Sequence, residues 1–449
     1  MAQSRAYSAQ NSFAGAENYS MNELINPRLN PTPDLARPDL QGCGPLLQGP
    51  FHDAKPLRQK VFEHVRATGL AARADVSRAL GISAGTVTQL TSDLIAQGYL
   101  CESTDQPRDR RDAGRGRPSV ALSVVPGAHR VIGIKLSDER HTAVLADFAG
   151  NILAEAMLPT PPVRRTLDQI CEEVSTLVDR VLDIAAIGRD EVSAVGIGLS
   201  GLVEPETGVV PWSPLMTGTS LPLREALTRK LGCETLIEND ANTLTLSELW
   251  FGAGRATSDF AVVTIEHGVG MGLVVANRLY RGTRGMGMEL GHIKVQLDGA
   301  LCRCGQRGCL EAYLADYALA REAATALERN PRNIASPQAM LETLFAEAKG
   351  GNTAARTIFK RAGRYLSLGL ANVIQIFDPE LIILSGERMR YDYLYADEVL
   401  AEMQTLTLDH GREPCRVEIH AWGDMVWARG AAALALSHIT DSVMESGAA

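Results

Sequence analysis

The segment between residues 291 and 311 opens with Gly291-His292 and closes, from ten residues after the histidine, with Cys302-Arg303-Cys304-Gly305-Gln306-Arg307-Gly308-Cys309-Leu310-Glu311. Three thiols and one imidazole therefore lie within eighteen residues, with glycines between them. Zn²⁺ prefers four tetrahedral nitrogen or sulfur ligands at about 2.0 to 2.3 Å, and four protein ligands leave no position for water. We expect a closed, structural zinc site with these ligands: His292, Cys302, Cys304 and Cys309. The alternative is a group of reduced cysteines that bind no metal.

Two carboxylates flank these ligands, Glu289 before them and Glu311 after them. The pattern Gly-Glu-x-Gly-His followed by Cys-x-Cys-Gly-x-x-Gly-Cys-x-Glu resembles the ROK family (repressor, open reading frame, kinase). Only Met288 departs from the pattern, standing where the family usually has glycine. The resemblance implies that Glu289, His292 and Glu311 hydrogen-bond sugar hydroxyls, with His292 using one ring nitrogen for zinc. The alternative is that both glutamates are solvated surface charges.

Length and composition bound the rest of the chain. With 449 residues, 45% of them hydrophobic, we expect two or three domains with a buried core. No run of about 18 uncharged apolar residues is present, so we expect no membrane span. Residues 1–50 are rich in Asn, Ser, Pro and Gln and lack a signal-peptide pattern, which predicts a disordered tail on a cytoplasmic protein. The remaining cysteines are scattered singly, as is typical of a reducing compartment: Cys43, Cys101, Cys171, Cys233 and Cys415.

Positive charge gathers in one segment of an acidic chain. The net charge is −9, yet residues 55–117 contain eleven Lys or Arg against seven Asp or Glu, a local excess of +4 that leaves −13 elsewhere. Such a local excess indicates a polyanionic partner for this segment alone. We therefore expect residues 51–125 to form a DNA-binding domain whose partner is double-stranded operator DNA.

Apolar spacing in this segment predicts three helices, at residues 57–67, 73–80 and 84–96. Between the second and third lies the turn Gly81-Ile82-Ser83, in which Ser83 is placed to cap the third helix. This is the helix-turn-helix layout, in which the last helix enters the major groove. The side chains expected to reach base edges or phosphates are polar and lie near the start of that helix: Ser83, Thr86, Thr88 and Gln89. A three-helix unit without a nucleic-acid role is the alternative.

A wing is expected after the third helix. Strands are predicted at residues 99–101 and 120–124, on either side of an Arg-, Asp- and Gly-rich stretch that ends Gly114-Arg115-Gly116-Arg117-Pro118. Arginines flanked by glycine fit the narrow minor groove, where the negative potential is strong. Arg115 and Arg117 are therefore predicted to contact DNA, with a solvated loop as the alternative. ROK-family repressors resemble the chain here as well, from about Pro56 to Val124.

From residue 130 to residue 449 strands alternate with helices in two comparable rounds. The first round is expected to hold strands and one helix at residues 131–134, 142–146, 151–156, 166–184 (the helix) and 194–198. The second is expected to hold strands at residues 260–265, 272–276 and 381–384. Two such halves describe the actin-like architecture of sugar kinases, which is RNase H-like, and the family resemblance implies the same. The expected fold class is α/β, with an N-terminal winged helix-turn-helix before a two-lobed actin-like domain that binds its ligand between the lobes.

The run Glu238-Asn239-Asp240-Ala241-Asn242 follows an expected strand and precedes a helix that ends at Phe251. In ROK sugar kinases the matching aspartate is the general base toward the sugar hydroxyl, so the resemblance gives Asp240 the base position and Asn239 a neighbouring hydroxyl. Asn-Asp also suits a helix start, which is the structural alternative. Ser200-Gly201 is expected to bring backbone against the sugar. Leu215 stands where the family often has asparagine, which leaves the identity of the sugar open.

The loops that would hold nucleotide differ from those of the family's kinases. Their Asp-x-Gly-Gly-Thr motif corresponds to Lys135-Leu136-Ser137-Asp138-Glu139, which lacks both glycines and carries two carboxylates. The second loop, residues 266–272, adds Glu266, and Ser385-Gly386-Glu387 replaces a glycine-rich turn. Carboxylates beside polyphosphate repel it, at a cost of several kcal/mol in a partly dry site. We expect a sugar binder without catalytic residues, in which Asp240 is vestigial.

The sequence thus predicts a sugar-responsive, DNA-binding transcriptional regulator, expected to be a repressor. A homodimer or dimer of dimers would present its recognition helices to a palindromic operator, and sugar binding would close the lobes. Two other functions stay open: an ATP-dependent sugar kinase that also binds DNA, and a DNA-binding protein whose sensor contacts a partner protein. The sequence leaves open the sugar, the operator, the target genes and the direction of the response.

Overall fold

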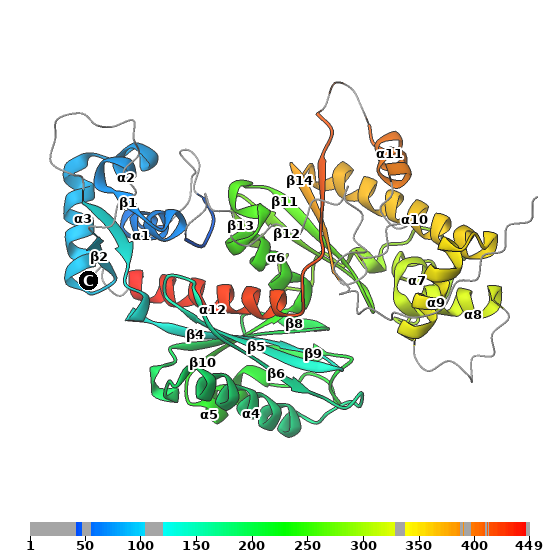
Figure 1. The fold of residues 1–449 in the computed structure, drawn as a ribbon, viewed down its shortest axis with the longest axis horizontal. Coiled ribbons are helices and arrows are strands. Elements are labelled where there is room, and N and C mark those ends of the chain that lie inside the picture. The colour runs from blue at the N-terminus through cyan, green and yellow to red at the C-terminus, as the bar shows by residue number, and fades with distance from the viewer. Residues whose placement is uncertain are drawn as a thin grey trace, which may run out of the picture.

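The computed structural model describes residues 42–46, 55–103, 120–327, 337–386, 389, 397–408, 411 and 413–445. An N-terminal unit of small elements lies beside two larger lobes, each built on a five-stranded sheet (Figure 1). We call these parts the winged unit, lobe 1 and lobe 2. Among the described helices, none is both long and apolar enough to cross a bilayer.

The winged unit consists of three helices and a three-stranded sheet of order β1-β3-β2. Its elements are α1 (Leu57–Thr68), β1 (Ala71–Ala72), α2 (Arg73–Leu80), α3 (Ala84–Ala96), β2 (Leu100–Ser103) and β3 (Ala121–Val124). Gly81 ends α2 with φ +65°, a left-handed conformation that glycine adopts without strain. Ser83 then caps α3 by accepting a hydrogen bond from the Thr86 amide, 3.1 Å away. The structure thus contains the three predicted helices and the predicted cap of the third.

Lobe 1 has strand order β10-β7-β4-β5-β6. The strands are β4 (Arg130–Leu136), β5 (Arg140–Asp147), β6 (Ile152–Pro159), β7 (Ala194–Leu199) and β10 (Glu234–Asn239). The first three form the expected antiparallel meander, while β7 and β10 run parallel to β4. Two helices cover one face and α12 (Met425–Glu445) covers the other (Figure 1): α4 (Leu167–Ala185) and α5 (Leu223–Leu231). A hairpin of β8 (Leu202–Glu204) and β9 (Val209–Trp212) was not predicted.

Lobe 2 repeats this plan with strand order β13-β12-β11-β14-β15. The strands are β11 (Phe260–Ile265), β12 (Val269–Val275), β13 (Arg278–Tyr280), β14 (Leu381–Ser385) and β15 (Arg416–His420). Its helices are α7 (Glu311–Leu314), α8 (Asp316–Ala326), α9 (Pro337–Lys349), α10 (Thr353–Phe377) and α11 (Asp397–Leu406). Alternate residues of β11 face two cores, with Val263 packed toward these helices and Val262 toward α6 (Asp240–Phe251). The described residues also include short 3₁₀ helices at Pro126–Ala128, Arg189–Glu191, Ala253–Ala256 and Leu290–His292.

Helices α6 and α12 cross at close range between the two sheets. A Cβ on Gly430 would lie 1.6 Å from the carbonyl oxygen of Thr243, and one on Gly133 would lie 2.0 Å from that of Ala428. Only glycine permits these approaches, because no side chain fits at such a distance. The first approach joins α12 to α6 and the second joins α12 to β4, so both helices pack closely between the two five-stranded sheets of the expected α/β architecture.

The winged unit shares its core with the lobes. The rings of Phe62 on α1 and Phe148 after β5 lie with their centroids 5.0 Å apart, and Gln59 donates to Asp441 on α12 at 2.6 Å. Residues 42–46 also pack here, although the sequence assigned them to a tail without fixed structure. Cys43 is buried because its small thiol fits against Gly150, and its amide donates to the carbonyl of Arg66.

Candidate functional site

The four predicted metal ligands lie together on lobe 2. Their ligand atoms are all within 4.8 Å of one another. Sγ of Cys304 lies 3.6 Å from Sγ of Cys309, and Sγ of Cys302 lies 3.8 Å from Nδ1 of His292. Tetrahedral zinc with bonds of about 2.3 Å to sulfur has ligand–ligand edges of about 3.8 Å. The cluster could therefore hold a metal ion, and the spacing of its donors fits the size of a closed tetrahedral site.

Local hydrogen bonds shape the loop that carries these ligands. The amide of Cys302 donates to the carbonyl of Gln306 at 2.8 Å, and the amide of Gly305 donates back to the carbonyl of Cys302 at 3.0 Å. Gly308 has φ +76°, and a Cβ there would lie 1.7 Å from the carbonyl oxygen of Gln296. The glycines noted in the sequence thus have a steric reason, because the loop must fold tightly to bring the thiols together.

Lys294 was not singled out in the sequence, yet it contacts the cluster. Its Nζ lies 3.0 Å from Sγ of Cys309 and 3.1 Å from the carbonyl oxygen of His292. The hydrogen bond to Cys309 raises the pKa of this exposed lysine, although partial loss of solvent opposes the rise. Three thiolates around a divalent ion leave one excess negative charge, which Lys294 is placed to balance.

Glu311 joins the cluster to the β-sheet of lobe 2. Its side chain is buried, and one carboxylate oxygen lies 3.5 Å from Sγ of Cys302 and 3.3 Å from the hydroxyl of Tyr317. The other oxygen accepts a hydrogen bond from the amide of Val269 at 3.4 Å. Glu311 is therefore not a solvated surface charge. Tyr317 is a second contact that sequence reasoning missed, since nothing local marks it.

Glu289 lies near the other acidic candidates but remains partly in water. Its side chain is 46% exposed, and Nε2 of His292 is 4.0 Å from its carboxylate. Partial burial away from water raises the pKa of Glu289. The charge of His292 acts against this rise, whereas the charges of Asp240 and Glu311 add to it. The carboxylates of Asp240 and Glu311 are thus close enough to Glu289 to interact with it electrostatically. Because Nδ1 of His292 faces the thiols, Nε2 is the nitrogen turned toward these carboxylates.

The lobe 1 candidates are linked at the start of α6. Ser200 donates to the carboxylate of Asp240, and Nδ2 of Asn239 donates to the carbonyl of Gly201 at 2.9 Å. Oδ1 of Asn239 accepts from the amide of Ala241 at 2.9 Å, so the residue does cap the helix. The structure brings these four predicted residues together: Ser200, Gly201, Asn239 and Asp240. Leu215, in contrast, packs in the core of lobe 1.

A buried ion pair beside these residues was not predicted. The carboxylate of Glu238 is 1% exposed and accepts a hydrogen bond of 2.5 Å from Nε of Arg281, which follows β13 of lobe 2. Its other oxygen accepts from Asn242 and from the amide of Asn239, both at 2.9 Å. The pairing fixes the chain just before Asp240. The acidic residue ahead of Asn-Asp was visible in the sequence, but its partner 43 positions later was not.

The turn expected to face phosphate is occupied by protein groups. The amide of Ser137 donates to Nδ1 of His141 at 3.1 Å, and Nε2 of that fully buried ring lies 2.9 Å from Glu173. Burial lowers the pKa of His141, with the hydrogen bond and charge of Glu173 acting against it. Lys135, where kinases of the family have aspartate, lies with Nζ 3.4 Å from the ring centroid of Trp427. Glu387 lies outside the described residues.

The DNA-binding candidates of α3 lie on its outer side. Ser83, Thr88 and Gln89 are exposed and Thr86 is half-buried, whereas Val87 is buried in the core. Thr88 donates to the carbonyl of Ala84 at 2.8 Å, and the hydroxyls of Ser83 and Thr86 lie 2.8 Å apart. Arg115 and Arg117 lie outside the described residues.

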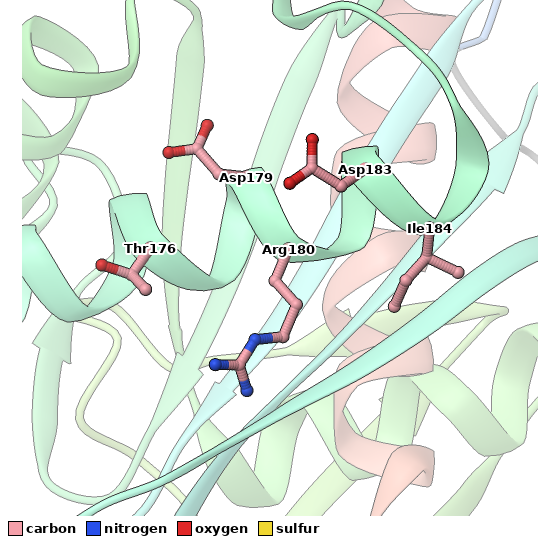
Figure 2. Close-up of a pocket in the computed structure, with 5 residues that line it drawn as sticks. All are labelled: Thr176, Asp179, Arg180, Asp183 and Ile184. Atoms are coloured by element: carbon pink, nitrogen blue, oxygen red, sulfur yellow. The ribbon is translucent and has the colours of Figure 1, made fainter.

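A shallow hollow on α4 holds none of these candidates. Figure 2 shows side chains from one side of the helix around it: Thr176, Asp179, Arg180, Asp183 and Ile184. Arg180 donates to the carbonyl of Met157 on β6, which ties the helix to the edge strand. The hollow is therefore a feature of helix packing on lobe 1, away from the residues that carry chemistry.

Residues 131–438, which include nearly all of both lobes, the His292/cysteine cluster and Asp240, match the family model described as ROK family. The chain belongs to the ROK family. A xylose repressor of Caldicellulosiruptor bescii is 25% identical to it over 344 residues, which cover 76% of this chain and 85% of the relative. A glucokinase of Streptomyces coelicolor is 30% identical over 264 residues, which cover 57% of this chain and 81% of the kinase.

A solved structure of a ROK protein shares the fold over most of this chain. A crystal structure of a ROK family transcriptional regulator, titled a homologue of the Escherichia coli MLC protein, superposes with a TM-score of 0.71 at 23% identity. The match covers 87% of this chain and 97% of the other. At this identity the likeness shows the fold, and it confirms the predicted fold class.

Proposed function

We propose that this ROK protein is a transcriptional repressor whose affinity for operator DNA depends on a sugar bound between its lobes. The observation that carries the proposal is a winged unit that shares one apolar core with a sugar-kinase-like body. A rearrangement of the lobes would therefore reach the recognition helices directly. The similarity to a xylose repressor over 76% of the chain supports the same function.

The DNA contacts of the proposal come from the outer side of α3 and from the wing. Ser83, Thr88 and Gln89 are exposed where a recognition helix meets base edges and phosphates, with Thr86 beside them. The wing arginines, Arg115 and Arg117, would add minor-groove contacts. Two such units, in a homodimer or a dimer of dimers, would read a palindromic operator.

The sugar would bind to polar groups contributed from both sides of the lobe boundary. Lobe 1 and the start of α6 offer Ser200, Gly201, Asn239 and Asp240. Lobe 2 offers Glu289, His292 and Glu311. Carboxylates are acceptors with several lone pairs, so neighbouring hydroxyls of a sugar can each donate to one of them. A ligand held in this way contacts both lobes and favours the arrangement in which they are close.

The metal of the proposal is Zn²⁺, held by His292, Cys302, Cys304 and Cys309. Bound there, zinc would supply structural cross-linking rather than a reactive water, because its four positions are filled by protein. Cys302 lies 3.5 Å from the carboxylate of Glu311, so fixing the thiol also fixes that carboxylate. The residues therefore link metal binding to sugar binding through a direct contact.

Loss of kinase activity is the second part of the proposal. Lys135 stands in place of an aspartate that organises Mg²⁺, and the Ser137 amide is already bonded to His141. Retention of Asp240 and the similarity to a glucokinase favour the rival function, an ATP-dependent sugar kinase that also binds DNA. The two functions differ in turnover, which can be measured.

The test uses the full-length protein. Duplexes selected from a random pool give an operator, and its affinity is measured by fluorescence anisotropy with and without D-xylose, D-glucose or N-acetyl-D-glucosamine. We expect one sugar to change operator affinity at least fivefold. The same sugars with ATP and Mg²⁺ are followed by a coupled assay for ADP. Turnover at about 1 to 100 per second, the ordinary range of kinases, would overturn the proposal in favour of the enzyme.

A further inference from the structure

Two turns that correspond to phosphate-binding loops of ROK kinases contact each other across the lobe boundary. Glu139 lies in the turn between β4 and β5 of lobe 1, and His267 lies in the turn between β11 and β12 of lobe 2. Nε2 of His267 is 4.0 Å from the carboxylate of Glu139, and Nδ1 is 2.8 Å from that of Asp316. An imidazole is thus placed between carboxylates of two lobes.

The lobe 2 half of this contact is built rigidly. Asp316, the first residue of α8, has a side chain that is only 4% exposed, and its amide donates to the carbonyl of Glu266 at 3.2 Å. His267 is therefore fixed by α8 on one side, while its other ring nitrogen points toward lobe 1. Glu139 lies in the turn between β4 and β5, and its side chain is 53% exposed. Its carboxylate can therefore change position more easily than that of Asp316.

The same turn touches the proposed sugar site. Val269, two residues after His267, donates its amide to the carboxylate of Glu311 at 3.4 Å, and a Cβ on Gly268 would lie 3.0 Å from that carboxylate. A sugar hydroxyl that hydrogen-bonds Glu311 would therefore contact a carboxylate that already accepts a hydrogen bond from this turn. Sugar binding and the position of His267 cannot be independent.

We propose that Glu139, His267 and Asp316 form an interlobe contact that takes the place of a nucleotide, holding the lobes in the arrangement that binds sugar. In a kinase, phosphate and metal bridge these two turns; here protein side chains do. The proposal rests on the proposed function, since it names what sets the affinity of the sugar site. Losing the contact makes the sugar bear the whole cost of bringing the lobes together, so affinity falls.

The experiment compares Glu139→Gln with a control, Asp138→Asn. The control removes a neighbouring carboxylate for which no ion-pair partner is found among the described residues. His267→Gln and the double variant complete a double-mutant cycle. Hydrogen exchange of the sugar-free proteins is measured for residues 136–140 and 265–269. Sugar affinity is measured by calorimetry with whichever of D-xylose, D-glucose or N-acetyl-D-glucosamine most raises the melting temperature of the wild type.

We expect Glu139→Gln to increase exchange in both turns and to weaken sugar binding about two- to fivefold, which is within the range measured for contacts between exposed charged side chains. The double variant should be no weaker than His267→Gln alone. Exchange and affinity equal to those of Asp138→Asn would overturn the interlobe contact. If no sugar binds the wild type, the proposed function fails, and the exchange measurement still decides whether the two turns are joined.

Discussion

At the scale of single residues, the surroundings of His420 control its ionisation. The ring is 2% exposed, with Nδ1 2.8 Å from Glu248 and Nε2 3.3 Å from Glu418. Burial alone would lower the pKa of His420, but the hydrogen bonds and charges of the two glutamates raise it to about 9. The folded pKa then lies above the unfolded value of about 6.5. Protonated His420 therefore stabilises the folded state fully below pH ~6.5, and this stabilisation is lost as pH rises through about 9.

The first prediction follows from this sign. The melting temperature of the wild type should fall between pH 7 and pH 10, and His420→Asn should flatten that part of the profile because it removes the group that titrates. A pKa shift of this size corresponds to roughly 3 kcal/mol. Thermal melting at five pH values measures it. His438→Asn, at a position 40% exposed, is the control and should keep the wild-type slope. Parallel profiles for all three proteins would contradict the prediction.

The second residue-scale prediction concerns the metal. Cys304→Ser should reduce bound zinc from about one ion per chain to nearly none, because one of the four donors is lost. Sugar affinity should fall at least tenfold, since Glu311 is held through Cys302. Operator binding without sugar should persist. Zinc is measured by mass spectrometry, and Cys415→Ser, a cysteine outside the cluster, is the control. Full sugar affinity in a zinc-free Cys304→Ser protein would refute the link.

The cluster of His292 with three cysteines could be predicted because its members lie close together in the sequence, where spacing alone limits which atoms meet. The pairs Glu238–Arg281 and Glu248–His420 could not, since each joins residues from different strands or helices. The partners of such buried charges depend on how the two lobes are packed. A sequence shows the acidic residue but not the cation that neutralises it.

At the scale of elements, the α6–α12 crossing depends on one glycine. In an open helix, replacing glycine by alanine stabilises the fold by roughly 0.5 to 1 kcal/mol. At Gly430 the new Cβ would lie 1.6 Å from the carbonyl of Thr243, so backbone must move. We predict that Gly430→Ala destabilises by at least about 1 to 3 kcal/mol, as overpacking does. Differential scanning calorimetry should show a lower melting temperature for this variant only.

Gly423→Ala is the matched control for that prediction, because a Cβ at Gly423 meets nothing within 4 Å. It should melt within a few degrees of the wild type. A Gly430→Ala protein as stable as this control would show that the crossing adjusts without cost. The packing of α12 against α6 would then be less tight than the distances at Gly430 indicate.

Helices with one exposed face were predictable, whereas the enclosed helix α12 was not. The helices Arg73–Leu80 and Ala84–Ala96 have the predicted bounds, because one apolar side and a capping residue mark them. Helix α12 was missed, since it is apolar on most sides where it packs between two sheets and the winged unit. A helix enclosed in this way lacks the amphipathic period that reveals a surface helix.

At the scale of the whole molecule, the junction between the winged unit and the lobes includes, beside the shared apolar core, backbone contacts to one arginine. Arg255, just after α6, is 3% exposed and donates to the carbonyls of Gly44 and Ala67 at 3.0 and 2.5 Å. Asp240, at the other end of α6, belongs to the proposed sugar site. A single helix therefore joins the sugar residues to the base of the winged unit. This connection could not be predicted, because no local motif marks Arg255.

The last prediction tests that connection. Arg255→Lys keeps the charge but cannot hold two carbonyls with a planar fork. The winged unit should loosen, so hydrogen exchange in residues 57–68 should increase while that of β11 and β14 stays at the wild-type rate. Sugar affinity should change less than twofold, but the effect of sugar on operator affinity should fall at least threefold, because a loosened winged unit differs less in placement between the two states that sugar selects. Arg229→Lys, on the exposed side of α5, is the control. If Arg255→Lys loosens α1 and the sugar response survives intact, the signal does not pass through this junction, and the shared apolar core around Phe62 and Phe148 must carry it instead.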